Sequence, residues 1–484
     1  MRLWWVVLAA GCTRPPAPIA ADAWSNDGPG LGATQFDAQA LLTRCAVLDG
    51  GPEDVDHHNL VGMHNGYLVL PWAPEEGGGG ISFFDVSDPC SPIEVGRGFS
   101  EFMRESHTLS FGTVDGRDYL AVDYIADGGR IGGVGFWDVT DPTAPFWASE
   151  LALDGFVYPD SYTRLTLSTF WQGPYLYVSG AFNGVYVVDV SDPLNPSAVA
   201  QFNLEPPTSV GTVHVVGTRA LISSSGLART AIVDVSDPLQ PAPVAGADWS
   251  TEDANGDPRP FYFANLLGQY AVYARNGRAG GPIVYDLSDP DAPEWQGDAE
   301  SGDEGGYAMR HEDVVFIGDS EAGRLYDLNN DLALIGELAL QGDLDTVTPV
   351  GNVLVASVDE GGVPGEGSVI MPWKTAPDTR GPVLELAIPA DGDTFVATTA
   401  RIGLSYNEAI ARRSVHPGSV RLTDAKGFAV DAAFHVQEGI VNISPTLPLL
   451  RDSEYRVEVA AGGVSDVSGN AVDDSVIWGF TTEP

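Results

Sequence analysis

One phrase, repeated along the chain, constrains the fold more than any other feature of the sequence. Each copy begins as a run of β-branched and aromatic residues and continues into Asp-Val-Ser-Asp-Pro or a close variant. Such a run favours a buried strand, and the Asp, Ser and Pro that follow favour a tight turn whose side-chain oxygens bond nearby backbone N–H groups. The copies are ISFFDVSDPCSP from residue 81, VGFWDVTDPTAP from 134, VYVVDVSDPLNP from 185, TAIVDVSDPLQP from 230, PIVYDLSDPDAP from 282 and the degenerate GRLYDLNND from 323. We therefore interpret the aspartates as structural turn residues and assign them no site role.

The spacing of the copies predicts a β-propeller. The first aspartates of the copies lie 41 to 53 residues apart: Asp85, Asp138, Asp189, Asp234, Asp286 and Asp327. A second apolar strand precedes each copy, and a period of about 40 to 50 residues with several strands is typical of propeller blades. A further strand pair, NVLVASVDEGG from 352 and SVIMPW from 368, lacks the aspartates and makes a seventh blade. The strand LTRCAVLD at 42–49 is expected to complete this last blade, so that the ring closes without a free edge.

The repeated DVSDP-x-x-P phrase resembles that of the LVIVD-repeat family of bacterial and archaeal cell-surface proteins. The resemblance covers about residues 42–373. It implies a propeller fold and an envelope location, and it carries no catalytic residues over to this chain.

From residue 381 the sequence changes to short strands without the repeat, which suits a small β-sandwich. This part resembles the bacterial Ig-like domain of surface-layer proteins in four motifs: PADG from 389, LSYNE from 404, VSDVSGN from 464 and FTT from 480. In that family the module acts mostly as a spacer or adhesive unit. The fold class expected for the chain is therefore all-β, a seven-bladed β-propeller followed by a small Ig-like sandwich.

The N-terminal residues resemble a bacterial lipoprotein signal. Arg2 is followed by a short apolar run at 3–10, and small residues precede Cys12. The expected organisation is a signal peptide at 1–11, a tether at 12–40, the propeller at 41–374, a linker at 375–380 and the Ig-like domain at 381–484. Lipidation of Cys12 would anchor the chain in the envelope, with Thr13 favouring the outer membrane. An ordinary secretory signal with an incidental cysteine is the alternative.

The remaining cysteines, Cys45 and Cys90, form an even pair in an oxidising compartment, and we expect them to form a disulfide. They are expected on the outer strand of the last blade and the corner of the first, which are neighbours only if the ring closes as described. The net charge of −43 would repel nucleic acid, so that nucleic-acid binding is excluded.

The sequence contains no GxSxG elbow, HExxH helix, Gly-rich phosphate loop or CxxC pair. The weaker candidates are residues that lead into the first strand of each blade, since these segments line one mouth of a propeller channel. The candidates for ligand binding there are His58, His107, Asp160, Tyr162, Arg259, Tyr262, Glu304, Tyr307 and Asp345. Convergent His, Asp and Glu could hold a metal or act as acid and base, although a single His is more often a satisfied polar residue.

Asp253, Asn255 and Asp257 have the alternating oxygen spacing of a calcium loop. Pro258 and Ala264 stand where a full loop needs Gly and Glu, so an acidic turn is the competing interpretation. No other cofactor is expected.

The sequence favours a non-catalytic, lipid-anchored envelope scaffold, expected to be monomeric, that presents its propeller to a protein or glycan. The alternative is an extracytoplasmic hydrolase or lyase that uses the channel mouth, because propellers host many chemistries.

Overall fold

The repeated phrase forms the third strand and the following corner of each blade in the computed structural model. The strand ends on the first aspartate of the phrase, which accepts a hydrogen bond from the backbone N–H two residues later, as in Ser87 N to Asp85 (2.8 Å) and Ser191 N to Asp189 (2.9 Å). The second aspartate repeats this arrangement, as in Leu194 N to Asp192 (3.0 Å). The prediction that these aspartates are structural turn residues is confirmed.

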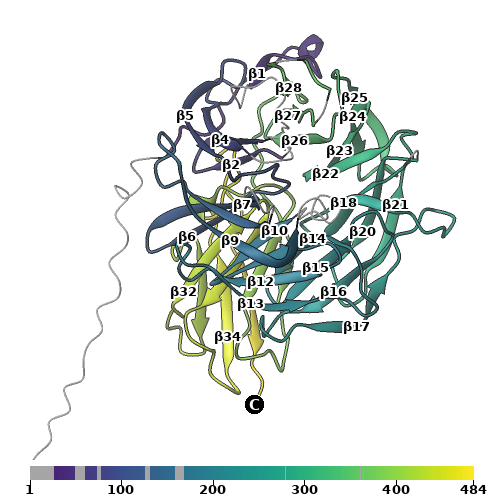
Figure 1. Ribbon diagram of the computed structural model, residues 1–484. Helices are drawn as coiled ribbons and strands as arrows, with labels where there is room; N and C mark the ends of the chain where they lie inside the picture. The colour runs from purple at the N-terminus through teal and green to yellow at the C-terminus, as the bar shows by residue number, and fades with distance from the viewer. Residues whose placement is uncertain are drawn as a thin grey trace, which may run out of the picture.

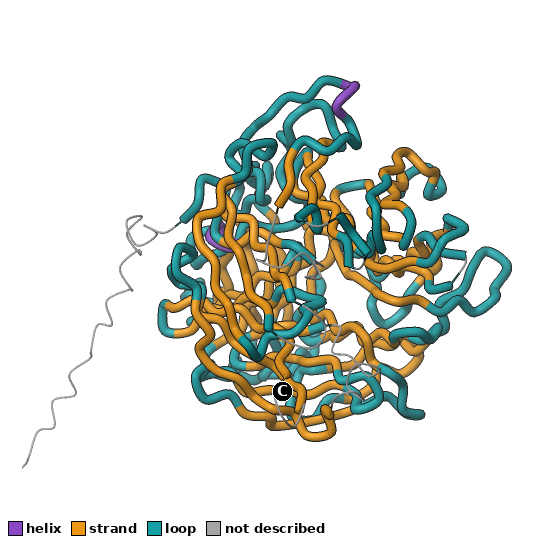
Figure 2. Tube along the Cα trace, turned by 45° about the horizontal axis from the view of Figure 1, so that its top comes forward, coloured by secondary structure: helices purple, strands orange, loops and turns teal. Residues whose placement is uncertain are grey.

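The structure describes residues 27–48, 60–73, 78–125, 131–157, 168–277, 279–359, 361–363 and 365–484. Strands make up almost all of its regular structure (Figure 2), with short 3-10 turns η2 (Ala38–Ala40) and η3 (Arg412–Ser414). Within these residues, no helix has the length and apolar character needed to cross a membrane.

Seven four-stranded antiparallel sheets are arranged around one centre (Figure 1) and form the predicted blades. Blades 1 to 3 are β2 (Gly62–His64), β3 (Tyr67–Trp72), β4 (Gly79–Asp85), β5 (Ile93–Ser100); β6 (Ser110–Val114), β7 (Arg117–Ile125), β8 (Ile131–Asp138), β9 (Phe146–Val157); and β10 (Thr169–Gln172), β11 (Tyr175–Ser179), β12 (Val185–Asp189), β13 (Ser197–Phe202). Blades 4 to 6 are β14 (Val210–Val216), β15 (Arg219–Ser224), β16 (Thr230–Asp234), β17 (Ala242–Trp249); β18 (Phe261–Leu267), β19 (Tyr270–Arg275), β20 (Pro282–Asp286), β21 (Glu294–Asp298); and β22 (Gly305–His311), β23 (Val314–Asp319), β24 (Ala322–Asp327), β25 (Ala333–Leu338).

The seventh blade joins the two ends of the propeller sequence. It consists of β26 (Thr346–Val350), β27 (Val353–Ser357), β28 (Ser368–Pro372) and the N-terminal β1 (Ala46–Leu48), which pairs with β28. The predicted closing strand is thus confirmed, although it is shorter than 42–49. The predicted disulfide is confirmed as well: Cys45 and Cys90 are bonded, with Cα atoms 5.1 Å apart, and they join blade 7 to blade 1.

The C-terminal strands form two sheets that enclose a second core. One sheet is β29 (Leu384–Ile388), β30 (Ile402–Tyr406), β33 (Ile440–Pro445) and β32 (Ala432–Gln437), and the other is β31 (Val420–Asp424), β34 (Glu454–Val459) and β35 (Val476–Thr481). Buried Leu404, Val441, Val457 and Trp478 belong to the core between them. The small sandwich predicted for this part of the chain is present.

The sandwich packs directly on the propeller instead of standing apart from it. Its β32 contacts β6 and β10, and its β30 and β33 contact β14 (Figure 1). Leu386, Ile388 and Ile440 belong to the same apolar cluster as the core residues of blades 3 to 5. This packing differs from the separate spacer that the sequence suggested, because one sheet of the sandwich has an apolar outer face as well as an inner one.

Candidate functional site

The two ends of the propeller channel have different surroundings. The Ig-like domain covers the end where the first strand of each blade finishes: Asn442 accepts hydrogen bonds from Gln172 Nε2 (2.9 Å) and Gly217 N (2.8 Å). The channel-mouth candidates lie at the opposite end, where these strands begin. His107 precedes β6 by three residues, and Asp345 immediately precedes β26. The domain therefore leaves the predicted mouth uncovered.

At this mouth, residues from four blades lie close together. The rings of His107 and Tyr307 stack with centroids 6.3 Å apart, and the centroid of Tyr262 lies 5.7 Å from that of Tyr307. The backbone N–H of Tyr307 donates to the carbonyl of Asp345 (2.9 Å). The structure thus brings together four of the predicted residues, His107, Tyr262, Tyr307 and Asp345, from blades 2, 5, 6 and 7.

His107 contacts two carboxylates that the sequence analysis did not identify. Glu105 Oε1 lies 3.2 Å from Nε2, and Asp123 Oδ2 lies 3.7 Å from Nδ1, with all three side chains buried. Burial alone would lower the pKa of His107, but the charge of Glu105, together with Asp123, raises it to about 10. His107 is therefore an imidazolium at neutral pH. The signal for Asp123 was its position as an acid directly after the apolar run YLAV in the strand DYLAVDY.

The pKa values of two acids at the mouth are raised as well. Burial, followed by the charges of Asp359 and Asp343, raises the pKa of Asp345 well above its ordinary value. Burial also raises the pKa of Asp123, against the effect of His107. Crowded carboxyl groups in a desolvated place hold protons more tightly, because ionising all of them would place like charges side by side.

Several buried polar atoms at the mouth have no hydrogen-bond partner among the residues that the structure describes. They are Nε and Nη2 of Arg104, Nδ1 of His107, Oδ2 of Asp123 and the hydroxyl of Tyr307. Buried polar groups are normally satisfied, and a group left unsatisfied costs about 1–3 kcal/mol. Both donors and acceptors are unmet, so a partner with both kinds of group, ordered water or a polar ligand, would satisfy them.

The other predicted mouth residues lie elsewhere or outside the described residues. His58, Asp160 and Tyr162 lie outside the described residues. Glu304 is exposed on the loop before β22. Arg259 is paired with Asp253 through a hydrogen bond from Nε (2.7 Å), away from the mouth cluster.

The calcium interpretation of Asp253, Asn255 and Asp257 is not supported by the geometry. Asp253 Oδ1 accepts hydrogen bonds from the backbone N–H groups of Asn255 (2.8 Å) and Asp257 (3.1 Å), and Oδ2 accepts from Arg259. Both oxygens of this carboxylate are thus engaged by donors, and the hydrogen bond from Arg259 lowers the pKa of Asp253 to about 2. The segment is therefore the acidic turn of the competing interpretation. The guanidinium of Arg259 lies where a calcium ion would have to bind.

Comparison with protein families identifies two segments. Residues 378–482 match the bacterial Ig-like domain, and residues 171–203, which contain the strands of blade 3, match the LVIVD repeat. No curated protein matches the sequence significantly.

Similar solved structures include several propellers. The β-propeller domain of Cps50 (Swd1) from Myceliophteria thermophila is 12% identical, with a TM-score of 0.45, over 65% of this chain and 96% of that one. BamB from Moraxella catarrhalis is 11% identical, with a TM-score of 0.42, over 68% and 96%. The periplasmic gluconolactonase PpgL from Pseudomonas aeruginosa is 11% identical, with a TM-score of 0.45, over 66% and 88%. The resemblances to the LVIVD repeat and to the bacterial Ig-like domain are therefore confirmed, for residues 171–203 and 378–482.

Proposed function

We propose that the protein is a non-catalytic extracytoplasmic binding protein whose propeller holds a hydroxyl-rich ligand, the end of a glycan, at the channel mouth opposite the Ig-like domain. The observation that carries this proposal is the set of buried groups without a hydrogen-bond partner among the described residues, Nε and Nη2 of Arg104 and the hydroxyl of Tyr307, beside the long ion pair of His107 and Asp123. A sugar hydroxyl both donates and accepts, so it suits a mixed set of this kind. Tyr262, which is half-buried beside Tyr307, adds aromatic surface for the apolar side of a sugar ring.

The protonation of the mouth favours binding over catalysis. A general base must be unprotonated at the working pH, whereas His107, with its pKa raised to about 10, is protonated at pH 7. Burial raises the pKa of Tyr307 well above its ordinary value, so its hydroxyl stays protonated too. These groups can hold a ligand at neutral pH, but neither is available to remove a proton from it.

The envelope location is supported by the disulfide and the Ig-like domain, which both indicate an extracytoplasmic protein. We extend this to a lipid anchor at Cys12, in the outer membrane, with the propeller as the ligand-presenting part. Cys12 lies outside the described residues, and its sequence context is the support for this step.

Binding can be tested on an array of bacterial cell-wall oligosaccharides and neutral oligosaccharides, followed by calorimetry on the strongest hit. Tyr307→Phe removes one unmet hydroxyl and keeps the ring, so affinity should fall about 2- to 10-fold, the value of one hydrogen bond. Tyr177→Phe is the matched control, because Tyr177 is equally buried and its hydroxyl also has no hydrogen-bond partner among the described residues, but it lies on β11, away from the mouth.

Equal loss of affinity in both variants, or no loss in Tyr307→Phe, would contradict the assignment of the site. Cleavage of the bound oligosaccharide, followed by mass spectrometry, would instead establish the hydrolase or lyase alternative.

A further inference from the structure

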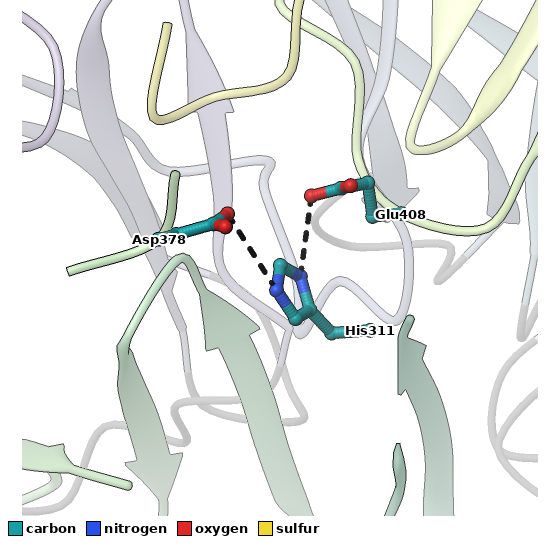
Figure 3. Close-up of side chains that lie close together, drawn as sticks. All are labelled: His311, Asp378 and Glu408. Atoms are coloured by element: carbon teal, nitrogen blue, oxygen red, sulfur yellow. Dashed lines mark ion pairs between the residues drawn. The ribbon is translucent and has the colours of Figure 1, made fainter. Parts of the chain in front are cut away.

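Three ionisable side chains meet where blade 6, the segment between the two domains and the Ig-like domain come together. His311 is the last residue of β22, Asp378 lies between β28 and β29, and Glu408 follows β30 by two residues. Figure 3 shows the imidazole between the two carboxylates, with Asp378 facing one ring nitrogen and Glu408 facing the other. The group therefore belongs to both domains and lies apart from the channel mouth.

These contacts are too long for good hydrogen bonds. His311 Nδ1 lies 3.6 Å from Glu408 Oε2, and His311 Nε2 lies 3.7 Å from Asp378 Oδ2, whereas N–H···O bonds span about 2.7–3.2 Å. The side chains of His311, Asp378 and Glu408 are only 3%, 4% and 1% exposed. Both oxygens of Glu408, Nε2 of His311 and Oδ2 of Asp378 have no hydrogen-bond partner among the described residues.

The nearest basic side chains already have a partner of their own. Lys374 Nζ and Arg380 Nε pair with the carboxylate of Glu312 at 2.6 and 2.7 Å. Glu408 and Asp378 therefore lie on either side of the imidazole of His311, and within the described residues no basic side chain is hydrogen-bonded to either carboxyl group. Two buried carboxylates in this position are costly unless a positive charge compensates them.

A second histidine on the same face of the propeller shows what a satisfied site looks like. His64 Nε2 lies 3.6 Å from Asp118 Oδ2, a similar distance. The carboxylate of Asp118, however, accepts hydrogen bonds from Asn65 (2.8 Å), Thr113 (2.6 Å) and Arg413 (3.0 Å). Both histidines thus make long contacts with carboxylates at the interface. The carboxylate beside His64 is hydrogen-bonded by other side chains, whereas, among the described residues, the carboxylates beside His311 are not.

The uncompensated group fits a metal ion. One donor atom from each of the three residues can be chosen so that all lie within 4.8 Å of one another, and this is the one such group within the described residues. Ligands of a tetrahedral ion with bonds of about 2.1 Å lie about 3.4 Å apart, so donor atoms that are up to 4.8 Å apart need to close by about 1.4 Å. One imidazole nitrogen with two carboxylates suits zinc and similar divalent transition metals, while calcium and magnesium prefer oxygen alone.

We propose that His311, Asp378 and Glu408 together bind one divalent transition-metal ion, which fastens the Ig-like domain to blade 6. The two carboxylate charges balance the charge of the ion. One nitrogen of His311 ligates the metal, and small rotations of the carboxylates bring both to it.

The test is calorimetric titration of the full chain, stripped with chelator and dialysed, with zinc chloride. We expect one equivalent of zinc to bind, and Asp378→Asn and Glu408→Gln each to weaken this binding at least about tenfold. His64→Gln is the matched control, because it removes an equally buried imidazole from the same interface, and it should leave zinc binding unchanged. Far-ultraviolet circular dichroism checks that each variant is folded.

A second measurement reports on the role of the ion. Zinc should raise the thermal unfolding midpoint of the wild type and of His64→Gln, and at the same zinc concentration it should raise that of Glu408→Gln less. Stoichiometric zinc binding that persists in both Asp378→Asn and Glu408→Gln, a preference for calcium over zinc, or no stoichiometric binding at all would overturn the proposal. The result is independent of ligand binding at the channel mouth, since Tyr307→Phe leaves all three ligands in place.

Discussion

The bond between Cys45 and Cys90 should contribute strongly to stability because it crosses the junction where the ring closes. Cys45 lies directly before β1, the strand that completes blade 7, and Cys90 lies in the corner between β4 and β5 of blade 1. β1 pairs with β28 through only three residue pairs. The closing strand is thus short, and the disulfide ties it covalently to the neighbouring blade.

The size of the effect follows from the length of the closed segment. The two cysteines are 45 residues apart, and restricting a loop of this length in the unfolded chain is worth about 4 kcal/mol in the chain-entropy description. The same loss would move the thermal midpoint by only about 4 °C, because the unfolding entropy grows with chain length. Denaturant unfolding is therefore the more sensitive assay.

The double variant Cys45→Ser/Cys90→Ser should unfold in urea with a free energy about 4 kcal/mol below that of the oxidised wild type, as followed by tryptophan fluorescence. Wild type kept under reducing agent should behave like the variant, which separates loss of the bond from loss of packing by the sulfur atoms. A difference below about 1 kcal/mol would refute the argument, since it would mean that blade 7 holds its outer strand without the covalent bond.

Three further outcomes are expected. Burial lowers the pKa of His214 to about 4, whereas the unfolded chain binds that proton near pH 6.5. His214 should therefore contribute about 1.4 kcal/mol per pH unit to the fall in the free energy of unfolding between pH 6.5 and 4. His214→Gln should reduce the slope by about this amount in urea unfolding at several pH values. Asn442→Ala leaves the buried partners Gln172, Gly217 and Val215 unpaired and should cost about 1–3 kcal/mol in the same assay, while Ser444→Ala, which removes a buried hydroxyl without a hydrogen-bond partner among the described residues, should cost little. Cys12→Ala should move the protein from the membrane fraction to the soluble fraction, as shown by fractionation and immunoblotting; wild-type protein recovered entirely in the soluble fraction would rule out the anchor.

The fold could be predicted because the repeated phrase specifies the same local chemistry in each blade. The strand that ends on Asp189 and the turn closed by its side chain are encoded within a dozen residues, so no distant contact is needed to recognise them. Ring closure was predictable for a related reason: only a strand from the start of the propeller could complete blade 7. The position of the Ig-like domain could not be predicted, because it depends on apolar residues such as Ile388 and Ile440 on a sheet face that the sequence pattern does not distinguish from the inner one.

The candidate site was predicted in part. Aligning the blades identified His107, Tyr262, Tyr307 and Asp345, since equivalent positions of a repeat converge at one end of the channel. The same alignment placed Arg259 at the mouth, and the structure shows its side chain hydrogen-bonded to Asp253 in the loop before β18. The group of His311, Asp378 and Glu408 was missed because its members come from two domains and the segment between them, and no spacing in the sequence reveals such a contact.

The buried polar side chains at the two ends of the channel differ in how they are hydrogen-bonded. Where the Ig-like domain packs on blades 2 to 4, Asn442 and Gln437 both donate and accept hydrogen bonds across the contact, while Oε1 of Gln172 and the hydroxyl of Ser444 have no partner among the described residues. At the mouth, Arg104 and His107 keep unmet donors and Asp123 an unmet acceptor within the described part of the chain. An interface that formed only to stabilise the fold would gain from satisfying such groups, since each unmet one is costly. The unmet donors of Arg104, a buried charged side chain, are the reason to look at the mouth for the ligand.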